Sequence, residues 1–273
     1  MTVEPPGARP HSLPMLTLAA IRRRAPHWLV LARREIGPIA LVLAVAFCLL
    51  LFRGIAEEVG EGDTRVVDRT IMYALRTPGN AARPIGPDWL NIAAIDITSL
   101  GSVTVLSIIV LLVTGLFLSF RRWREALLLL LASGGGLILT NILKDVFQRD
   151  RPPAVLHAVR AINASFPSGH ATLSATVFLT LGALIAHFAE RRRVRVYALA
   201  AGVILSLLVG CSRVYLGVHW PTDVLAGWCV GSAWALLWWG AAIFWERITH
   251  RRLSTGRAPR LQPEDGAILS EGG

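Results

Sequence analysis

Long apolar runs alternate with short polar connections through most of the chain. A helix that crosses a bilayer needs roughly 17 or more consecutive apolar residues, and six runs approach or exceed that length. They lie at residues 36–52, 101–120, 126–146, 169–188, 196–211 and 224–245, of which the first and fifth are the shortest. The pattern predicts an all-α, polytopic membrane protein, built as a six-transmembrane-helix bundle.

The two ends of the chain differ from this central part. Residues 1–35 form a predicted N-terminal segment whose first 14 residues are polar and proline-rich, and residues 247–273 form a predicted disordered tail. Between residues 15 and 34, apolar residues alternate with arginine clusters. That stretch is either an interfacial helix on the membrane surface or a linker whose charges only fix the topology. The membrane domain is assigned to residues 36–246.

The longest connection between predicted spans covers residues 53–100. Ahead of a turn-rich stretch at 77–87, it carries apolar residues at helical spacing: Val66, Val67, Ile71, Met72, Ala74 and Leu75. This spacing predicts an amphipathic helix that packs over the outer mouth of the bundle, either as a simple cover or as a lid.

Basic residues predict the orientation in the membrane. The net charge is +10, and the predicted inner segments carry 18 of the 27 arginines against eight acidic residues. The opposite face carries nine arginines and Lys144 against ten acidic residues. Because cytoplasmic segments are rich in arginine and lysine, both termini are predicted to be cytoplasmic. The basic residues flank apolar spans in short clusters without interleaved aromatic residues, so no nucleic-acid partner is expected.

Polar side chains gather at two of the predicted connections. One connection follows the third span and the other follows the fifth, so both emerge on the same face, which the arginine bias assigns to the extracytoplasmic side. The first carries Lys144, the only lysine, then Arg151-Pro152 and Pro167-Ser168-Gly169-His170; the second carries Ser212-Arg213, His219 and Asp223. Cations, hydroxyls, imidazoles and a carboxylate on one face predict a phosphate site.

Local signals predict how these groups are presented. A proline precedes Ser168, which makes Ser168 a natural N-cap of the fourth span, and the first amides and the dipole of that helix would face an anion. Pro221 suits the first turn of the last span and places His219 in the loop ahead of it. Asp223, four residues further on, is then able to hold one imidazole nitrogen.

These residues resemble the three-part signature of the type 2 phosphatidic acid phosphatase superfamily of lipid phosphatases. The signature stands here as Lys144, six residues, Arg151-Pro152; then Pro167-Ser168-Gly169-His170; then Ser212-Arg213, five residues, His219, three residues, Asp223. No signature position departs from the pattern, and the resemblance covers residues 36–245. It implies metal-independent hydrolysis of a membrane lipid phosphate through a phosphohistidine, without a cofactor. The superfamily also includes vanadium-dependent haloperoxidases, but six spans favour a lipid substrate. We expect an integral protein of a bacterial inner (plasma) membrane.

Each residue type supports a particular role. Phosphoryl transfer depends on positioning and on neutralisation of charge, which we assign to Lys144, Arg151, Ser168, Gly169 and Arg213, with Pro152, Pro167 and Ser212 as supporting positions. His219 is the predicted nucleophile and Asp223 fixes its tautomer. His170 is the predicted general acid, which protonates the departing lipid oxygen and later activates water. Two histidines and a carboxylate are also able to bind a divalent metal, but three permanent cations in the same pocket would repel it, so no metal is predicted.

Two other classes of function remain open from the sequence. A phosphotransferase would use the same residues and pass the phosphoryl group to a lipid or headgroup acceptor. A transporter would use charges along a path through the membrane, but the charges here cluster at one membrane edge. Phosphatidic acid, phosphatidylglycerol phosphate, isoprenoid diphosphates and phosphorylated lipid A all fit as substrates. The sequence does not distinguish among them, and it leaves the oligomeric state open.

Overall fold

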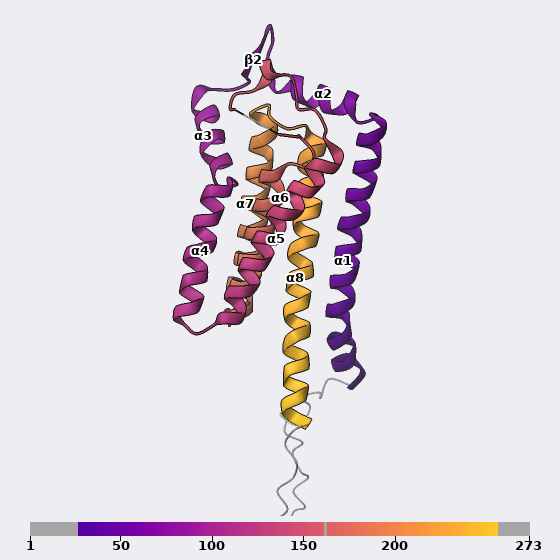
Figure 1. Cartoon of the computed structure of the whole chain (residues 1–273), viewed down its shortest axis with the longest axis vertical. Helices are drawn as coiled ribbons and strands as arrows, with labels where there is room; N and C mark the ends of the chain where they lie inside the picture. Colours follow the sequence, from indigo (N-terminus) through magenta and orange to yellow (C-terminus); the bar gives the residue numbers. More distant parts are fainter. Residues whose placement is uncertain (1–26, 161–162, 256–273) are drawn as a thin grey trace, which may run out of the picture. The chain divides into compact units, whose positions relative to one another are not determined.

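The computed structural model describes residues 27–160 and 163–255. The chain divides into two units, Met1–Ala40 and Leu41–Gly273, and all of the candidate site residues belong to the second. Helices dominate, with one short strand pair as the exception to the predicted all-α class (Figure 1). The elements in chain order are α1 (His27–Glu61), α2 (Arg65–Ala74), β1 (Arg76–Thr77), β2 (Asn80–Pro84), α3 (Asp88–Ser99), α4 (Val103–Ser119), α5 (Trp123–Phe147), η2 (Ala154–Leu156), α6 (Gly169–Phe188), α7 (Arg192–Tyr215) and α8 (Pro221–Thr255).

Five of the six predicted apolar runs lie within a helix, and the sixth, at 101–120, extends slightly beyond both ends of α4. In the described residues, five helices are long and apolar enough to cross a membrane: α1 from residue 37 onward, α5, α6, α7 and α8. Helices α3 and α4 meet at an angle of 50° across a short break, and they supply a sixth span if the bent pair crosses the membrane as one. The polytopic membrane class is confirmed, whereas the number of spans stays a prediction.

Two helices extend beyond the predicted boundaries. Helix α1 begins at His27, inside the predicted N-terminal segment, and continues to Glu61. Helix α8 continues to Thr255, so residues 247–255 of the predicted disordered tail are helical. The reason is visible in the sequence, where the first glycine or proline after residue 246 is Gly256. The predicted disorder of residues 1–14 and of the rest of the tail falls on residues outside the described ranges.

The segment between α1 and α4 contains the predicted helix. Helix α2 buries one polar residue, Asp68, and one of the predicted apolar residues, Met72, whereas Val66 is 75% and Val67 57% exposed. Exposed apolar side chains of this kind suit contact with lipid in a membrane protein. The predicted turn-rich stretch forms the β1–β2 hairpin, which turns at Gly79 with a φ of +80°. Helix α3, which was not predicted, follows it.

Helix α6 is the most buried helix and positions the rest of the described bundle. Eleven of its twenty residues are buried, and it packs mainly against α7 and α8, with α5 and α4 also in contact. Close packing against α8 depends on Gly227 and Gly231. A Cβ at Gly227 would lie 2.8 Å from the carbonyl oxygen of Ser168, and one at Gly231 would lie 2.4 Å from that of Thr172. The first turns of α6 and α8 are therefore held side by side.

Candidate active site

The α5–α6 and α7–α8 connections meet at one end of the helices, together with α2 and the hairpin (Figure 1). Gly217, with a φ of +78°, allows this approach, because a Cβ there would lie 2.0 Å from the carbonyl oxygen of Leu156. Arg76 stabilises this contact between the two connections, because its guanidinium donates to the carbonyl oxygens of Leu156 at 2.9 Å and Tyr215 at 3.0 Å. The structure thus brings together the two connections that the sequence predicted to share a face.

Three predicted phosphate-binding cations surround the start of α6. Lys144 lies in the last turn of α5, where its Nζ donates to the carbonyl oxygen of Ala164 at 2.5 Å. A Cβ on Gly169 would lie 3.6 Å from Lys144 Cε, so the lysine passes directly over the first residue of α6. Arg213 lies in the last turn of α7, is 5% exposed, and donates from Nη1 to Thr98 Oγ1 at 3.1 Å.

Near the start of α6, two buried donors have no hydrogen-bond partner among the described residues: Ser168 Oγ and Arg213 Nε. Ser168 is the N-cap residue of α6, as predicted, but its side chain does not cap the helix. Its backbone N–H instead donates to the carbonyl oxygen of Asp223 at 2.9 Å. A buried polar group without a partner is unfavourable by roughly 1–3 kcal/mol, which an anionic ligand would relieve.

His219 lies between the cations and a carboxylate, and it is 1% exposed. Arg151 Nη1 is 3.1 Å from His219 Nε2 and also donates to the carbonyl oxygen of Val218 at 2.7 Å. A guanidinium only donates hydrogen bonds, so Nε2 is the acceptor and the proton of the neutral ring lies on Nδ1. That Nδ1 faces Asp223 Oδ2 at 3.5 Å. The lone pair on Nε2 therefore points to Arg151, one of the predicted phosphate-binding cations.

Burial controls the protonation of this imidazole. It lowers the pKa of His219 to about 3, and the positive charges of Arg151 and Arg213 act in the same direction, while Asp223 opposes the shift. The ring is consequently neutral at physiological pH, as a nucleophile must be.

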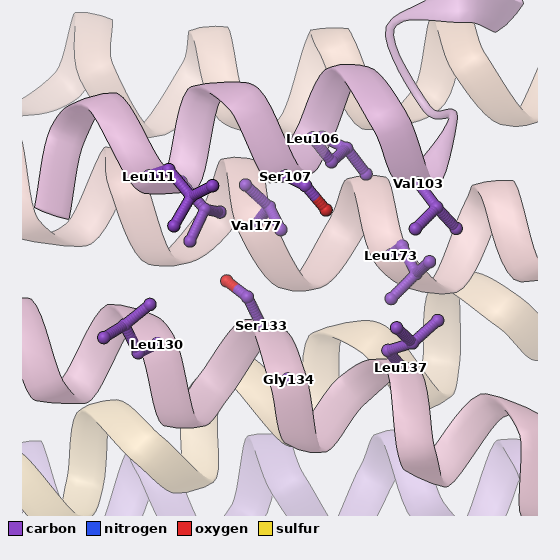
Figure 2. Close-up of a pocket in the computed structure, with 11 residues that line it drawn as sticks. Val103, Leu106, Ser107, Leu111, Leu130, Ser133, Gly134, Leu137, Leu173 and Val177 are labelled. Atoms are coloured by element: carbon purple, nitrogen blue, oxygen red, sulfur yellow. The ribbon is translucent and has the colours of Figure 1, made fainter.

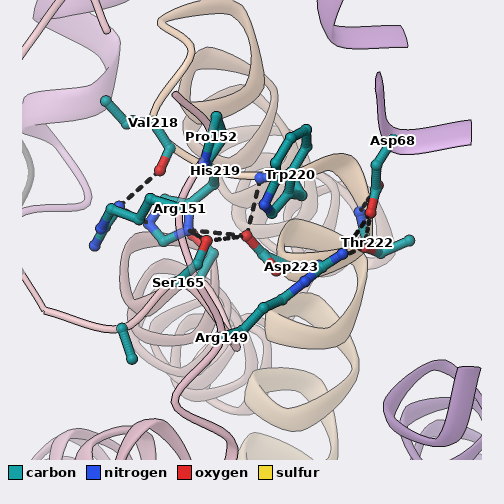
Figure 3. Close-up of polar contacts among 12 residues, drawn as sticks. Asp68, Arg149, Arg151, Pro152, Ser165, Val218, His219, Trp220, Thr222 and Asp223 are labelled. Carbon is teal, nitrogen blue, oxygen red and sulfur yellow. Dashed lines mark hydrogen bonds and ion pairs between the residues drawn. The ribbon is translucent and has the colours of Figure 1, made fainter. Parts of the chain in front are cut away.

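Asp223 is fully buried and binds on both of its oxygens (Figure 3). Its Oδ2 accepts hydrogen bonds from Ser165 Oγ and, at 2.9 Å, from the backbone N–H of Trp220. Its Oδ1 accepts from Arg149 Nη1 at 2.5 Å. Arg149 in turn donates from Nη2 to Asp68 Oδ2 of α2 at 2.7 Å. The predicted contact of Asp223 with His219 is thus part of a larger network.

Sequence reasoning missed Arg149, Asp68, Ser165 and Thr98. Arg149 stands two residues before a signature arginine, and that proximity was the only local signal. Asp68 and Thr98 come from the 53–100 connection, where no motif distinguishes them from other polar residues.

The remaining predicted residues also lie near the meeting point. His170 is in the first turn of α6, where Arg213, His219 and Lys144 act electrostatically on its ring. Pro152 accepts a hydrogen bond on its carbonyl oxygen from His157 Nε2 at 2.9 Å. Ser212 Oγ donates to the carbonyl oxygen of Val209 at 2.7 Å within α7, so its role here is structural. Pro167 is buried ahead of α6.

An apolar groove runs beside the site, between α4 and α5, with α6 behind it. Its volume is about 220 Å³, and its α6 lining begins at Leu173, three residues beyond His170. Figure 2 shows Ser107 and Ser133 pointing into a groove otherwise lined by aliphatic side chains. In the described ranges, no three His, Cys, Asp or Glu side chains are placed together to hold a metal ion.

The chain is similar to known membrane phosphatases. Residues 125–247 match the PAP2 superfamily. Phosphatidylglycerophosphatase B of Bacillus subtilis is 38% identical over 155 residues, which cover 55% of this chain and 74% of that protein. Undecaprenyl-diphosphatase of Sulfolobus acidocaldarius is 35% identical over 126 residues, which cover 44% and 57%. The crystal structure of a transmembrane PAP2-type phosphatidylglycerolphosphate phosphatase from Bacillus subtilis has a TM-score of 0.64 at 31% identity and covers 77% of this chain and 96% of that one.

The buried donors and the neutral imidazole lie together at one end of the apolar helices. The chain belongs to the PAP2 superfamily, and it is an integral-membrane lipid phosphatase.

Proposed function

We propose that the protein hydrolyses a phosphate monoester or diphosphate of a membrane lipid at the extracytoplasmic face, through a phosphohistidine on His219. One observation carries the proposal: Ser168 Oγ and Arg213 Nε, both buried and without a partner among the described residues, lie at the meeting point that also presents His219 Nε2. These donors, with Lys144 and Arg151, are suited to the non-bridging oxygens of a phosphoryl group.

The first half of the reaction follows from this geometry. The Nε2 lone pair attacks phosphorus, so an N–P bond forms while the bond between phosphorus and the lipid oxygen breaks. The departing oxygen takes a proton from His170, whose protonated form is stabilised by the negative charge of the bound phosphate. The phosphorylated ring then carries a positive charge, which Asp223 stabilises through the proton on Nδ1.

Water completes the reaction. His170, now neutral, takes a proton from a water molecule as that water attacks phosphorus, and the N–P bond breaks. Free phosphate leaves, while His219 returns to its neutral form and His170 to its protonated form. The cations neutralise the phosphoryl oxygens in both halves, so no step requires a metal ion.

The groove between α4 and α5 supports a lipid substrate. Its α6 wall begins one helical turn from His170, and its lining is almost entirely aliphatic. A phosphate held at the start of α6 would leave a lipid chain free to lie along this groove within the membrane. The relatives named above are a phosphatidylglycerophosphatase and an undecaprenyl-diphosphatase, so both of these substrate classes belong among those to be compared.

A substrate panel tests the proposed function. Purified protein in detergent would receive phosphatidic acid, phosphatidylglycerol phosphate, an isoprenoid diphosphate or phosphorylated lipid A, each labelled in the phosphate. We expect release of free labelled phosphate, with no loss of activity in a chelator. Label appearing only in a second lipid would instead show a phosphotransferase. Activity that a chelator removes and zinc or magnesium restores would contradict the metal-free mechanism.

The proposed orientation needs its own experiment. Single cysteines introduced near the α5–α6 and α7–α8 connections would be labelled in intact cells by a reagent that does not cross the membrane. We expect labelling from outside, because the arginine-rich ends of the helices are proposed to be cytoplasmic. Labelling only after the membrane is opened would reverse the orientation.

A further inference from the structure

Arg149 is a fourth arginine at the site, but its contacts differ from those of the phosphate-binding cations. Its Nη1 donates to Asp223 Oδ1 at 2.5 Å and to Thr222 Oγ1 at 2.8 Å. Its Nη2 donates to Asp68 Oδ2 at 2.7 Å and to Thr64 Oγ1 at 3.2 Å. The side chain is 13% exposed and lies between two carboxylates that are almost fully buried. Its terminal nitrogens are therefore committed to protein acceptors.

Asp68 binds both Arg149 and the first turn of α8. Its Oδ1 accepts from the backbone N–H of Thr222 at 3.1 Å, and its Oδ2 accepts from Thr222 Oγ1 at 2.7 Å. Thr222 is the second residue of α8, so Asp68 caps a free amide of that helix from a different element. Asp223 reaches back to the amide of Trp220, which completes the first turn.

The two oxygens of Asp223 consequently have separate partners. Oδ2 faces the imidazole, Ser165 and Trp220, while Oδ1 accepts a hydrogen bond from Arg149. A carboxylate that rotates would move Oδ2 away from His219 Nδ1. Arg149 opposes that rotation by holding Oδ1, and Asp68 holds Arg149 in turn.

We propose that Arg149 and Asp68 are positioning residues for Asp223, so that helix α2 controls how well the nucleophile is oriented although it contributes no phosphate-binding group. The chain of contacts runs from Asp68 through Arg149 and Asp223 to His219 (Figure 3). The inference rests on the proposed function, because it assigns His219 as the group that attacks phosphorus.

The test uses Asp68→Asn in the full-length protein, with labelled dioctanoyl phosphatidic acid as substrate. The change removes the charge of Asp68 and keeps its size, so Arg149 loses one of its two carboxylates. We expect kcat to fall about 10-fold, as is typical when a catalytic group loses its orientation. KM and inhibition by inorganic phosphate should change less than about twofold, because the phosphate-binding donors are untouched.

Two further variants separate orientation from folding. Thr222→Val removes a hydroxyl that contacts both Asp68 and Arg149 but leaves all charges in place, and it should lower kcat less, in the same direction. Asp88→Asn is the matched control: it breaks an Asp–Arg pair of 3.0 Å on the same connection, but with side chains 59% and 88% exposed. It should leave kcat unchanged. Tryptophan fluorescence during heating reports whether each variant is folded.

A double-mutant cycle decides whether Asp68 acts through Asp223. In an Asp223→Asn background, Asp68→Asn should produce little further loss of kcat, because the carboxylate that it positions is already absent. An equal loss in both backgrounds, or a change in KM with kcat unaltered, would overturn the proposal. A wild-type protein that releases no phosphate from any lipid would instead contradict the proposed function, which distinguishes the two failures.

Discussion

The two sides of His219 both contain buried arginines, but they are built differently. On the phosphate side, Arg213 and Ser168 keep donor atoms without partners among the described residues. On the other side, Arg149 is bound by two carboxylates and two hydroxyls. Arg149 lies in the α5–α6 connection and Arg213 in the last turn of α7, and both are largely buried, so burial alone does not distinguish them.

The difference indicates what each side is for. Donors left without partners are unfavourable in the free protein and become favourable when an anion binds, as expected of a binding surface. A network whose charges are paired gains nothing from an anion and holds its members in place. Residues on the phosphate side should therefore favour activity but lower the stability of the free protein. Residues on the Asp223 side should favour both activity and stability.

The largest loss of turnover is expected at His219, which lies between the phosphate side and the Asp223 side. His219→Ala removes the nucleophile, so turnover should fall on the order of 10⁴-fold or more. Labelled phosphate release from lipid measures this loss. His187→Ala is the matched control, because His187 lies in the last turn of α6 and pairs there with Glu246 at 3.6 Å. Comparable activity in the two variants would remove His219 from the mechanism.

The comparison itself is tested by Arg213→Gln and Arg149→Gln. Arg213→Gln should lower kcat/KM about 10³-fold, since an arginine that neutralises a transferring phosphoryl group is worth that much or more. It should not lower the unfolding temperature, because it removes a buried cation that no described carboxylate binds. Arg149→Gln leaves two buried carboxylates without their cation and should cost about 3–5 kcal/mol of stability.

Thermal unfolding in detergent, followed by tryptophan fluorescence, separates these two variants. Equal loss of stability in both would mean that the two sides of His219 do not differ in the way described.

A smaller loss is expected from Lys144→Arg. The lysine is 3.6 Å at Cε from the position of a Cβ on Gly169, and its Nζ is 2.5 Å from the carbonyl oxygen of Ala164. A planar guanidinium would not fit the same space, so kcat should fall about 100-fold although the charge is kept. Full activity in the phosphate-release assay would show that only the charge matters at this position.

The smallest effect concerns pH. The pKa of His219 is lowered to about 3 in the folded protein, so the unfolded chain takes up the proton first as the pH falls. The stability that the protein owes to keeping His219 neutral is fully present above the pKa of the unfolded chain, about 6.5. It is lost progressively as the pH falls toward 3. At pH 5 the free energy of unfolding has fallen by about 2 kcal/mol through this proton uptake. His219→Gln should therefore lose less stability than the wild type between pH 7.5 and 5, as measured by unfolding temperature; identical losses would contradict the assigned shift.

Several features of this site could be predicted because they depend on local patterns. The spacing of Pro221 and Asp223 places the start of α8 and the imidazole ahead of it, and the structure has both. The Asp68–Arg149 contact joins residues 81 positions apart, and no local rule selects the partner of a lone aspartate. The burial of Asp68 in α2 was missed for the same reason: the apolar spacing predicts the helix and includes the buried Met72, but it does not indicate that Asp68 binds Arg149 beside it. Helix α3 was missed although Pro87 and Asp88 are ordinary signals of a helix start.

In the proposed reaction, the phosphoryl group passes to Nε2 of His219, on the side of the buried donors. Wild-type protein would be mixed with labelled lipid phosphate, stopped in alkali within one turnover, and digested for mass spectrometry. We expect an acid-labile phosphate on the peptide that contains His219, and none on the peptide that contains His170. A phosphate on His170, or a phosphopeptide that persists in His219→Ala, would contradict it.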